Sequence, residues 1–555
     1  MASHARPRPP WGVLGVICPA LFMMVLDTSI VHMAIPVMMK DLATGLDQVL
    51  WIVNAYVLSY AILMITAGRL GDRFGPKRVY LAGLLLFTLA SALCGLSDGA
   101  VELIALRALQ GVGAALLTPQ TGALVAALFP PQRRGAAFGV LTSVIGVSIV
   151  AGPLLGGLLV SRAGWQWIFF VNVPVGIVAL VSAAVFVPEP GPRGNRGWDP
   201  TGLALVTGGL TALTFGLLEG GRYGSGAIAG PVTVPWVLGT GIVLLVLFAV
   251  QQWRRGTATG RPAPGPHRQA LLPRSLFAHR DFGLANVIGA GVHFAVIGSV
   301  LPITLFLQQV LGCSALRAGL VTAPTPLAAA AVAQVAGRLA DRVGGKSLLL
   351  AGLLTYALGL ALIALSARPG MNPWHLLPAM LVADIGIGCV LAPVTKIGMD
   401  AVDGALAGPA SGVLNTTRQV GGVLGSAAGG ALLQSRTAVA VHQQALDTAG
   451  LLPDAVRRPF VAGVDRGVTR GLTAGAGTDV PVPGSLDPHS AELFHTLAVA
   501  AYRHGFVAAM RDTALLPIGV LLFGAVCCLA VTGARGTRRE PVRGGGRRHT
   551  RARTP

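Results

Sequence analysis

The chain has 555 residues, of which 53% are hydrophobic and only 12% are charged, and its mean hydropathy is +0.68. A soluble domain carries about 25% charged residues, so this composition excludes an ordinary soluble protein. The net charge of +20 would suit a nucleic-acid-binding protein, but the basic residues gather in short loops between apolar runs, which argues against that class.

Apolar runs long enough to cross a bilayer recur along the chain. At about 20 residues per span, the pattern predicts an all-α membrane protein of fourteen helices. The first follows polar residues 1–10 and is interpreted as a retained span rather than a cleaved signal. The expected spans lie near 11–36, 49–68, 79–97, 101–129, 136–160, 166–187, 200–218, 232–253, 283–308, 317–336, 347–366, 373–395, 405–433 and 513–533.

The distribution of Lys and Arg predicts the orientation. With the N-terminus inside, the inside segments hold 28 basic residues and the short outside loops hold 5. Basic residues concentrate in cytoplasmic loops, and long loops count little in this rule. We therefore expect both termini to be cytoplasmic, in a multi-pass protein of the cytoplasmic (inner) membrane.

The remaining segments divide the chain. We expect an N-terminal six-helix bundle over 11–187, two inserted helices over 188–253, and a C-terminal six-helix bundle over 283–533. Segment 254–282 is a basic, Pro/Gly-rich linker, and 434–512 is an extracytoplasmic, partly helical insertion. Residues 1–10 and the basic tail 534–555 are cytoplasmic, and the tail is expected to be disordered and attracted to anionic lipid.

A short charged loop occurs twice. Gly68–Arg78 returns as Gly337–Lys346, 269 residues later and again between apolar runs, so the protein has two related halves. Gly68 and Gly75 permit a tight reversal. Arg73, Lys77 and Arg78 fix the orientation of the chain in the membrane, and this topological role alone would explain them. Asp72 and its counterpart Asp341 are expected to lock a conformation. Asp72 would face the positive N-terminal end of the thirteenth helix, near Gly404–Pro409.

Few ionisable residues lie within the predicted spans. A charge near the bilayer midplane costs several kcal/mol unless it is paired or hydrated, so such residues are functional candidates. For Arg418 the alternative explanation is helix packing, with its side chain bonded to backbone carbonyls. For His293 the alternative explanation is a buried histidine with a purely structural role. The candidates are Asp27, His32, Arg107, His293, Asp384 and Arg418.

Asp27 and Arg107 are expected to form the charged centre of the first bundle. From the expected helix ends, the two lie about 14 and 9 Å below the outer edge of the membrane, within reach of long side chains. A rocking motion that separates them would bind and release a proton. The alternative is a static ion pair that holds helices one and four together, and Asp384 is the next candidate carrier.

The fifth predicted helix carries glycines and a proline. Gly146, Gly152, Gly156 and Gly157 let a neighbouring backbone approach closely, and Pro153 removes one backbone hydrogen bond and bends the helix. Packing alone would account for the glycines. A bend that prevents leak between states is the functional interpretation.

Two other patterns carry little weight. Ala340–Ser347 fits a loose phosphate-loop pattern, but it follows a membrane helix and has no nucleotide-binding domain around it. The cysteines form no CxxC pair and are interpreted as small buried hydrophobes, so neither a metal site nor a disulfide is expected. They are Cys18, Cys94, Cys313, Cys389, Cys527 and Cys528.

These motifs resemble those of the major facilitator superfamily, in particular its fourteen-span drug/proton antiporters. The segment Leu26–Pro36 of the first predicted helix is similar to the family signature, with His32 where Asn is usual. The two charged loops, Arg107–Ala115 in helix four and Gly146–Gly157 in helix five match further motifs, as do Trp165–Pro174 and Asn415–Gly422. The resemblance covers residues 11–433 and the last helix.

The resemblance implies two six-helix bundles, each built from inverted repeats, around a central cavity, with helices seven and eight inserted between them. It implies proton-coupled efflux of small hydrophobic or cationic drugs and antibiotics by alternating access, with proton coupling at Asp27, Arg107 and Asp384. The expected cavity residues are Asp27, His32, Arg107, Gln110, His293, Asp384, Asn415 and Arg418.

Other functions stay open at this stage. An exporter of an endogenous metabolite, such as an amino acid or lipid, or an importer would have the same fold, although the helix-five motif argues against import. A non-transporting sensor would not require Asp27 and Arg107 in the membrane. No enzymatic activity, cofactor or metal is expected, and the proton gradient would supply the energy. The expected partners are the small-molecule substrate and membrane lipid, with no nucleic acid, around a monomeric protein.

The orientation is testable with single cysteines at Arg470 and Glu540, in a background that lacks the native cysteines. An impermeant thiol reagent applied to intact cells should label position 470 and leave position 540 unlabelled until the cells are opened. Labelling of 540 but not of 470 in intact cells would overturn the predicted topology.

Overall fold

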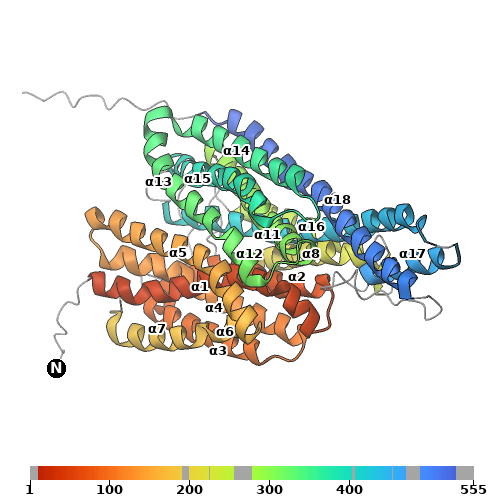
Figure 1. Ribbon diagram of the computed structural model, residues 1–555. Coiled ribbons are helices and arrows are strands. Elements are labelled where there is room, and N and C mark those ends of the chain that lie inside the picture. The colour runs from red at the N-terminus through yellow and green to blue at the C-terminus, as the bar shows by residue number, and fades with distance from the viewer. Residues whose placement is uncertain are drawn as a thin grey trace, which may run out of the picture.

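Two helical halves make up the molecule (Figure 1). The computed structural model describes residues 10–189, 199–223, 226–229, 231–255, 278–402, 407–452, 454–469 and 488–532. The halves meet at one end and diverge toward the end at which the first helix begins. The predicted all-α class is confirmed. Residues 1–9, most of the predicted linker 254–282 and the predicted tail 534–555 lie outside the described residues.

The N-terminal half consists of six spans, with a break in the last one. Its helices are α1 (Pro10–Asp41), α2 (Leu46–Phe74), α3 (Pro76–Leu96), α4 (Ala100–Leu128), α5 (Pro131–Ala163), α6 (Trp167–Phe170) and α7 (Asn172–Phe186). Proline occupies the first position of α3 and of α5, where its missing N–H is not needed. Gly75, with φ of +93°, makes the reversal between α2 and α3.

The inserted segment contains α8 (Pro200–Tyr223), a short antiparallel hairpin of β1 (Ala227–Ala229) and β2 (Val232–Thr233), and α9 (Val234–Arg255). Helix α8 packs against α2 of the first half and α16 of the second, and α9 packs on α8. The insertion therefore lies alongside the junction of the two halves. The hairpin was not predicted.

The C-terminal half repeats the architecture. Its helices are α11 (Arg280–Leu305), which continues as the π-helix η1 (Phe306–Val310), α12 (Ala315–Thr322), α13 (Pro324–Val343), α14 (Gly345–Ser366), the 3₁₀-helix η2 (Pro373–Leu376), α15 (Leu377–Asp400), α16 (Ala407–Ala449), α17 (Asp454–Thr469) and α18 (Pro488–Leu529).

The internal repeat extends to helix packing and backbone geometry. The α1–α5, α2–α4 and α3–α7 pairs of the first half correspond to α11–α16, α13–α15 and α14–α18 of the second. Gly344, the counterpart of Gly75, has φ of +95° and the same reversed backbone. The repeated loop identified in the sequence thus folds in the same way twice.

The predicted count of fourteen spans is not confirmed by length and hydropathy. Among the described helices, twelve are long and apolar enough to cross a membrane. The apolar stretch of α2 is shorter, Gln48–Met64, and α16 is not among the twelve. The first part of α16 is rich in Gly and also carries Ser, Thr, one Asn and Arg418, which lower its hydropathy although it packs within the second half.

The predicted ends of the helices around the insertion 434–512 were wrong. We expected helices to end near 433 and restart near 513, but α16 continues to Ala449 and α18 begins at Pro488. The extensions share an apolar core with α17, in which the Phe460 and Phe494 rings meet edge to face at 5.1 Å. Because α16 and α18 are continuous, this extension is tied to the second half.

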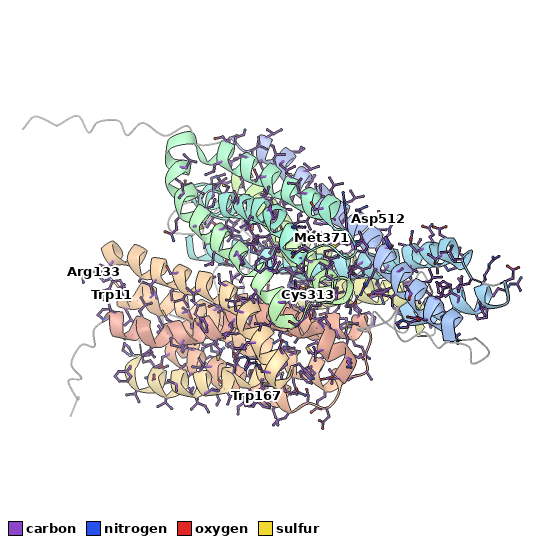
Figure 2. All side chains as sticks on the ribbon, viewed as in Figure 1. Trp11, Arg133, Trp167, Cys313, Met371 and Asp512 are labelled. Carbon is purple, nitrogen blue, oxygen red and sulfur yellow. The ribbon has the colours of Figure 1, made fainter. Side chains whose placement is uncertain are left out.

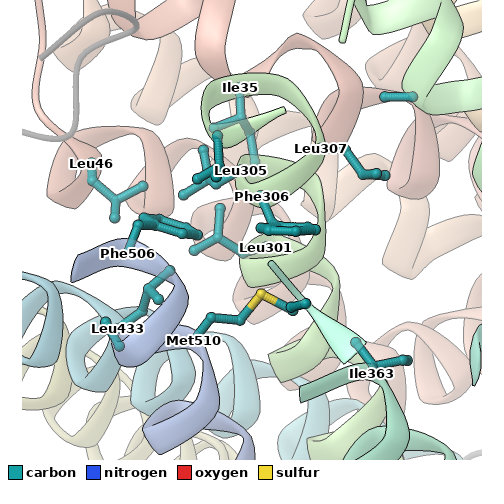
Figure 3. Packing of buried hydrophobic residues seen from close by; sticks show 14 of the residues in the cluster. Ile35, Leu46, Leu301, Leu305, Phe306, Leu307, Ile363, Leu433, Phe506 and Met510 are labelled. Atoms are coloured by element: carbon teal, nitrogen blue, oxygen red, sulfur yellow. The ribbon is translucent and has the colours of Figure 1, made fainter. Parts of the chain in front are cut away.

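A hydrophobic contact closes the end where the halves meet (Figure 3). Ile35 of α1 and Leu46 of α2 belong to one buried cluster with Leu301 and Leu305 of α11 and Phe506 of α18. The Gln308 side chain of η1 also donates a hydrogen bond to the Met33 carbonyl oxygen of α1 at 3.3 Å. We call this region the outer contact, after the side of the membrane on which the orientation predicted from the sequence places it.

Equivalent lysines of the two repeated loops cap the last helix of each half. Lys77 donates to the Ala184 carbonyl oxygen near the end of α7 at 2.9 Å. Lys346 donates to the Leu529 and Val531 carbonyl oxygens at the end of α18, both at 2.7 Å. The last carbonyls of a helix lack intrahelical partners, and a cation there also complements the helix dipole.

Replacing Lys346 with alanine should lower the thermal-unfolding midpoint of the purified protein, because the α18 carbonyls lose their donor, an effect of about 0.5–1.5 kcal/mol. Lys77→Ala should act in the same direction through α7. Arg503→Ala is the control, since Arg503 is exposed within α18 and away from any helix end. Equal midpoints for the Lys346 and Arg503 variants would contradict the assignment.

Candidate functional site

A large cavity lies between the two halves. Its volume is about 2830 Å³, and its walls come from α1, α2, α4 and α5 of the first half and from α11 and α13–α16 of the second. The lining extends from Gly15, near the start of α1, inward to Met33 and Pro153. Trp11 and Arg133, at the starts of α1 and α5, lie at this same end (Figure 2). The cavity therefore lies toward the end at which the halves diverge.

Asp27 and Arg107 form a buried ion pair beside the cavity. The Asp27 side chain is 0% exposed and that of Arg107 is 1% exposed. Arg107 Nη1 donates to Asp27 Oδ2 at 2.6 Å, a short charge-assisted bond. Helices α1 and α4 thus place the two side chains as the sequence predicted from their depths.

Neutral groups complete the hydrogen bonding of the pair. Gln110 Nε2 and Asn172 Nδ2 each donate to Asp27 Oδ1 at 3.1 Å. Arg107 donates to the Ile52 carbonyl oxygen through Nε and to Gln110 Oε1 through Nη1, and its guanidinium carbon lies 4.2 Å from the Tyr56 ring centroid. A buried ion pair is tolerated when its remaining donors and acceptors are satisfied. These groups stabilise the ion pair between Asp27 and Arg107.

Six of the eight residues expected in the cavity line it, namely His32, Arg107, His293, Asp384, Asn415 and Arg418. The prediction was wrong for the other two, Asp27 and Gln110, which do not line the cavity. They lie behind Arg107, whose guanidinium bonds to both of them. Sequence reasoning also missed Asn172 as a site residue, although it stands in the quoted Trp165–Pro174 motif, and it missed Tyr56.

Asp384 is a carboxylate that faces the cavity itself. It lies on α15 and lines the cavity, as does Thr325 of α13. Its side chain forms no ion pair with the described residues. The two carboxylates considered for proton coupling therefore differ in access, since Asp27 is sealed and Asp384 is open to the cavity.

The glycines of α5 serve two interfaces. Gly152 and Gly156 face α1, where added Cβ atoms would meet Ser29 and Ile30. Gly157 faces α12 of the other half, where a Cβ would lie 2.6 Å from the Ala315 carbonyl oxygen. Gly319 of α12 lies in turn against the Pro153 carbonyl oxygen. Gly146 has only ordinary contact, 3.8 Å from Ala330. The motif thus lets the two halves approach closely near the outer contact.

The loop predicted to lock a conformation is described only in part. Arg73 and Arg78 are exposed, and Arg78 pairs with Glu189 at 3.0 Å. Gly68 lines the cavity, and Gly75 makes the reversal. The side chains of Asp72 and Asp341, and the 403–406 segment that Asp72 was expected to face, lie outside the described residues. The predicted lock stays a prediction.

Comparison with known proteins identifies relatives over most of the chain. A family model described as Major Facilitator Superfamily matches residues 17–426. An "Uncharacterized MFS-type transporter" of Mycobacterium tuberculosis is 36% identical over 95% of this chain and 82% of its own length. The "Tetracenomycin C resistance and export protein" of Streptomyces glaucescens is 33% identical over 78% of each chain. The "Puromycin resistance protein pur8" of Streptomyces alboniger is 34% identical over 76% of this chain and 81% of its own.

Solved structures agree in fold. A bacterial homolog of the human lysosomal transporter Spinster, crystallised in an inward-facing and unoccupied conformation, superposes with a TM-score of 0.60 at 15% identity. The comparison covers 94% of this chain and 98% of that one. A peptide transporter in complex with sulfate superposes with a TM-score of 0.57 over 96% and 97% of the two chains, also at 15% identity. At this identity the likeness extends to the fold alone.

Substituting Gly157 or Gly319 with alanine should weaken the outer contact, because the added methyl group meets the backbone of the opposite helix. A cysteine at Ile35, buried in that contact, should then react several-fold faster with an impermeant thiol reagent. Gly146→Ala is the matched control in the same motif and should leave the rate unchanged. Equal rates in all three variants would show that these glycines do not hold the halves together.

Proposed function

The chain belongs to the major facilitator superfamily, and from that premise we propose that it exports small hydrophobic or cationic drugs and antibiotics in exchange for protons. The observation that carries the proposal is the large cavity between the two halves, which is mostly apolar and has Asp384 on its wall. The names of the relatives, which include resistance to tetracenomycin C and to puromycin, support this class of substrate.

The asymmetry of the two ends supports alternating access as the mechanism. The halves are packed together at the outer contact, and the cavity extends toward the start of α1. With the termini in the cytoplasm, as the basic loops predict, this is an inward-facing arrangement ready to take substrate from the cytoplasm or inner leaflet. Rocking of the halves would break the outer contact and present the cavity to the outside.

Proton coupling is assigned to Asp27 with Arg107, and to Asp384. In this arrangement Asp27 is sealed behind Arg107 and held by three donors, so a proton reaches it only after the pair separates. Separation on opening outward would link protonation to the change of state. A cationic substrate would bind to the carboxylate of Asp384 on the cavity wall.

The remaining parts of the proposal follow from the same scheme. The protein resides in the cytoplasmic membrane, acts as a monomer in contact with lipid, and needs the proton gradient but no bound cofactor. Export of an endogenous metabolite is the second candidate, since a cavity of about 2830 Å³ takes many shapes of molecule. A non-transporting sensor is disfavoured by the cost of keeping an ion pair within the membrane.

Asp27→Asn tests the coupling. Ethidium efflux driven by a pH gradient in membrane vesicles should fall at least about tenfold, equivalent to about 1.4 kcal/mol, while ethidium binding persists. Asp512→Asn is the control, because Asp512 is exposed on α18 and pairs only with Arg436 among the described residues.

Unchanged efflux by a normally expressed Asp27→Asn protein would exclude Asp27 as the carrier and leave the static ion pair as its role. Asp384→Asn would then be tested in the same assay. If the unsubstituted protein transports no ethidium in either direction, the same vesicle assay is repeated with an amino acid or a lipid in place of the dye.

A further inference from the structure

A second arginine, half-buried, lies on the cavity wall with no carboxylate of the described residues to neutralise it. Arg418 of α16 lines the cavity and donates through Nη2 to the Thr395 hydroxyl of α15 at 2.5 Å. Its Nε is buried and has no hydrogen-bond partner. No carboxylate of the described residues lies within 4.0 Å of its nitrogen atoms.

The contrast with Arg107 shows what Arg418 lacks. Arg107 has a carboxylate, a side-chain amide and a backbone carbonyl oxygen as partners. Arg418 has one neutral hydroxyl. The helix-packing explanation would require bonds from Arg418 to backbone carbonyls, and the described contacts include none. A guanidinium with one neutral partner keeps N–H donors for an anion that enters the cavity.

The nearest acidic candidate on the cavity wall cannot neutralise Arg418 directly. Asp384 and Thr395 both lie on α15, eleven residues apart, which corresponds to about 16 Å along a helix. Around Arg418 the cavity lining is polar and basic without being acidic, since it includes Lys396, which follows Thr395, together with Asn415 and Gln419. Farther inward on α11, the lining changes to apolar residues such as Val296 and Val300.

The position of the guanidinium is fixed by its neighbours. The stem of Arg418 runs over Gly289 of α11, where an added Cβ would lie 3.5 Å from its Cγ and Nε. One arm is held by Thr395. A planar guanidinium held in this way offers paired N–H donors that match the two oxygens of a carboxylate. The site therefore combines one oriented cation with an adjacent apolar surface.

We propose that Arg418 binds a single oxyanion, a carboxylate or phenolate, on an otherwise apolar exported molecule. The inference rests on the proposed transport function and extends its substrates to amphipathic acids. The acidic group would sit at Arg418 and Thr395, and the apolar body would lie along Val296 and Val300. A molecule with a cationic group would use Asp384 instead, so two separate anchors on one wall serve substrates of opposite charge.

Two probes with the same ring and opposite charge test the proposal. Binding of 2-naphthoate and of 2-naphthylmethylammonium is measured by titration of the full chain purified in dodecyl maltoside, an uncharged detergent that supplies no competing anion. Arg418→Gln should weaken 2-naphthoate binding about 10- to 100-fold, the range for lost charge-assisted hydrogen bonds, and leave the cationic probe within about twofold. Arg418→Lys should be intermediate, because it keeps the charge but loses the planar fork.

Two further variants keep the test decisive. Thr395→Val preserves the charge and removes the hydroxyl that orients it, so it should weaken 2-naphthoate several-fold even if Arg418→Gln fails to fold. Arg317→Gln is the matched control at an exposed arginine outside the cavity lining and should bind both probes as the unsubstituted protein does.

Equal losses for both probes, or no loss of 2-naphthoate binding in Arg418→Gln and Thr395→Val, would overturn the proposal. Failure of the unsubstituted protein to bind 2-naphthoate would overturn it as well. Ethidium efflux is measured on the same variants. If the Arg418 proposal fails but ethidium efflux persists, the proposed transport function is retained. If the unsubstituted protein shows no ethidium efflux, the proposed function itself fails.

Discussion

Among the ion pairs of the described residues, the Asp27–Arg107 pair is the one in which both side chains are sealed from solvent, and the centre of the N-terminal half is built around it. Two opposite charges in an apolar bundle are tolerable only while they stay paired and their remaining hydrogen-bonding groups are occupied. This requirement explains why Gln110, Asn172 and the Ile52 carbonyl oxygen surround the pair, and why Tyr56 lies against the guanidinium. In the proposed mechanism, a proton on Asp27 would remove the charge with which Arg107 pairs.

The two ends of the molecule also differ: the halves are packed together at the outer contact and diverge at the other end. At the outer contact, helices from the two halves approach so closely that only glycine fits, as at Gly157 and Gly319, and an apolar cluster excludes water around Ile35 and Phe506. Packed interfaces of this kind switch between discrete arrangements rather than deforming gradually. The continuous helices α16 and α18 carry the extension beyond the outer contact, so that the extension moves with the C-terminal half.

The cavity combines a large apolar surface with few fixed charges. Arg107 is neutralised by its partner, which leaves Asp384 and Arg418 as charges on the second half that have no ion-pair partner among the described residues. Broad apolar walls bind many shapes weakly, and a small number of oriented polar groups supplies selectivity. Placing the two charges apart on the same wall keeps them from pairing with each other and allows each to meet a different class of ligand.

The sequence by itself determined the elements that depend on local composition. Apolar runs gave the helical class and the division into halves, the repeated Gly68–Arg78 phrase predicted a repeated backbone, and helix depths predicted that Asp27 meets Arg107. Only the tertiary structure decided which residues face the cavity. Asp27 and Gln110 are sealed because the Arg107 guanidinium lies in front of them, and Arg418 is unpaired because its only described hydrogen-bond partner, Thr395, is neutral. A helical pattern specifies the face on which a side chain lies, but its partners come from helices distant in sequence, whose packing no local pattern encodes.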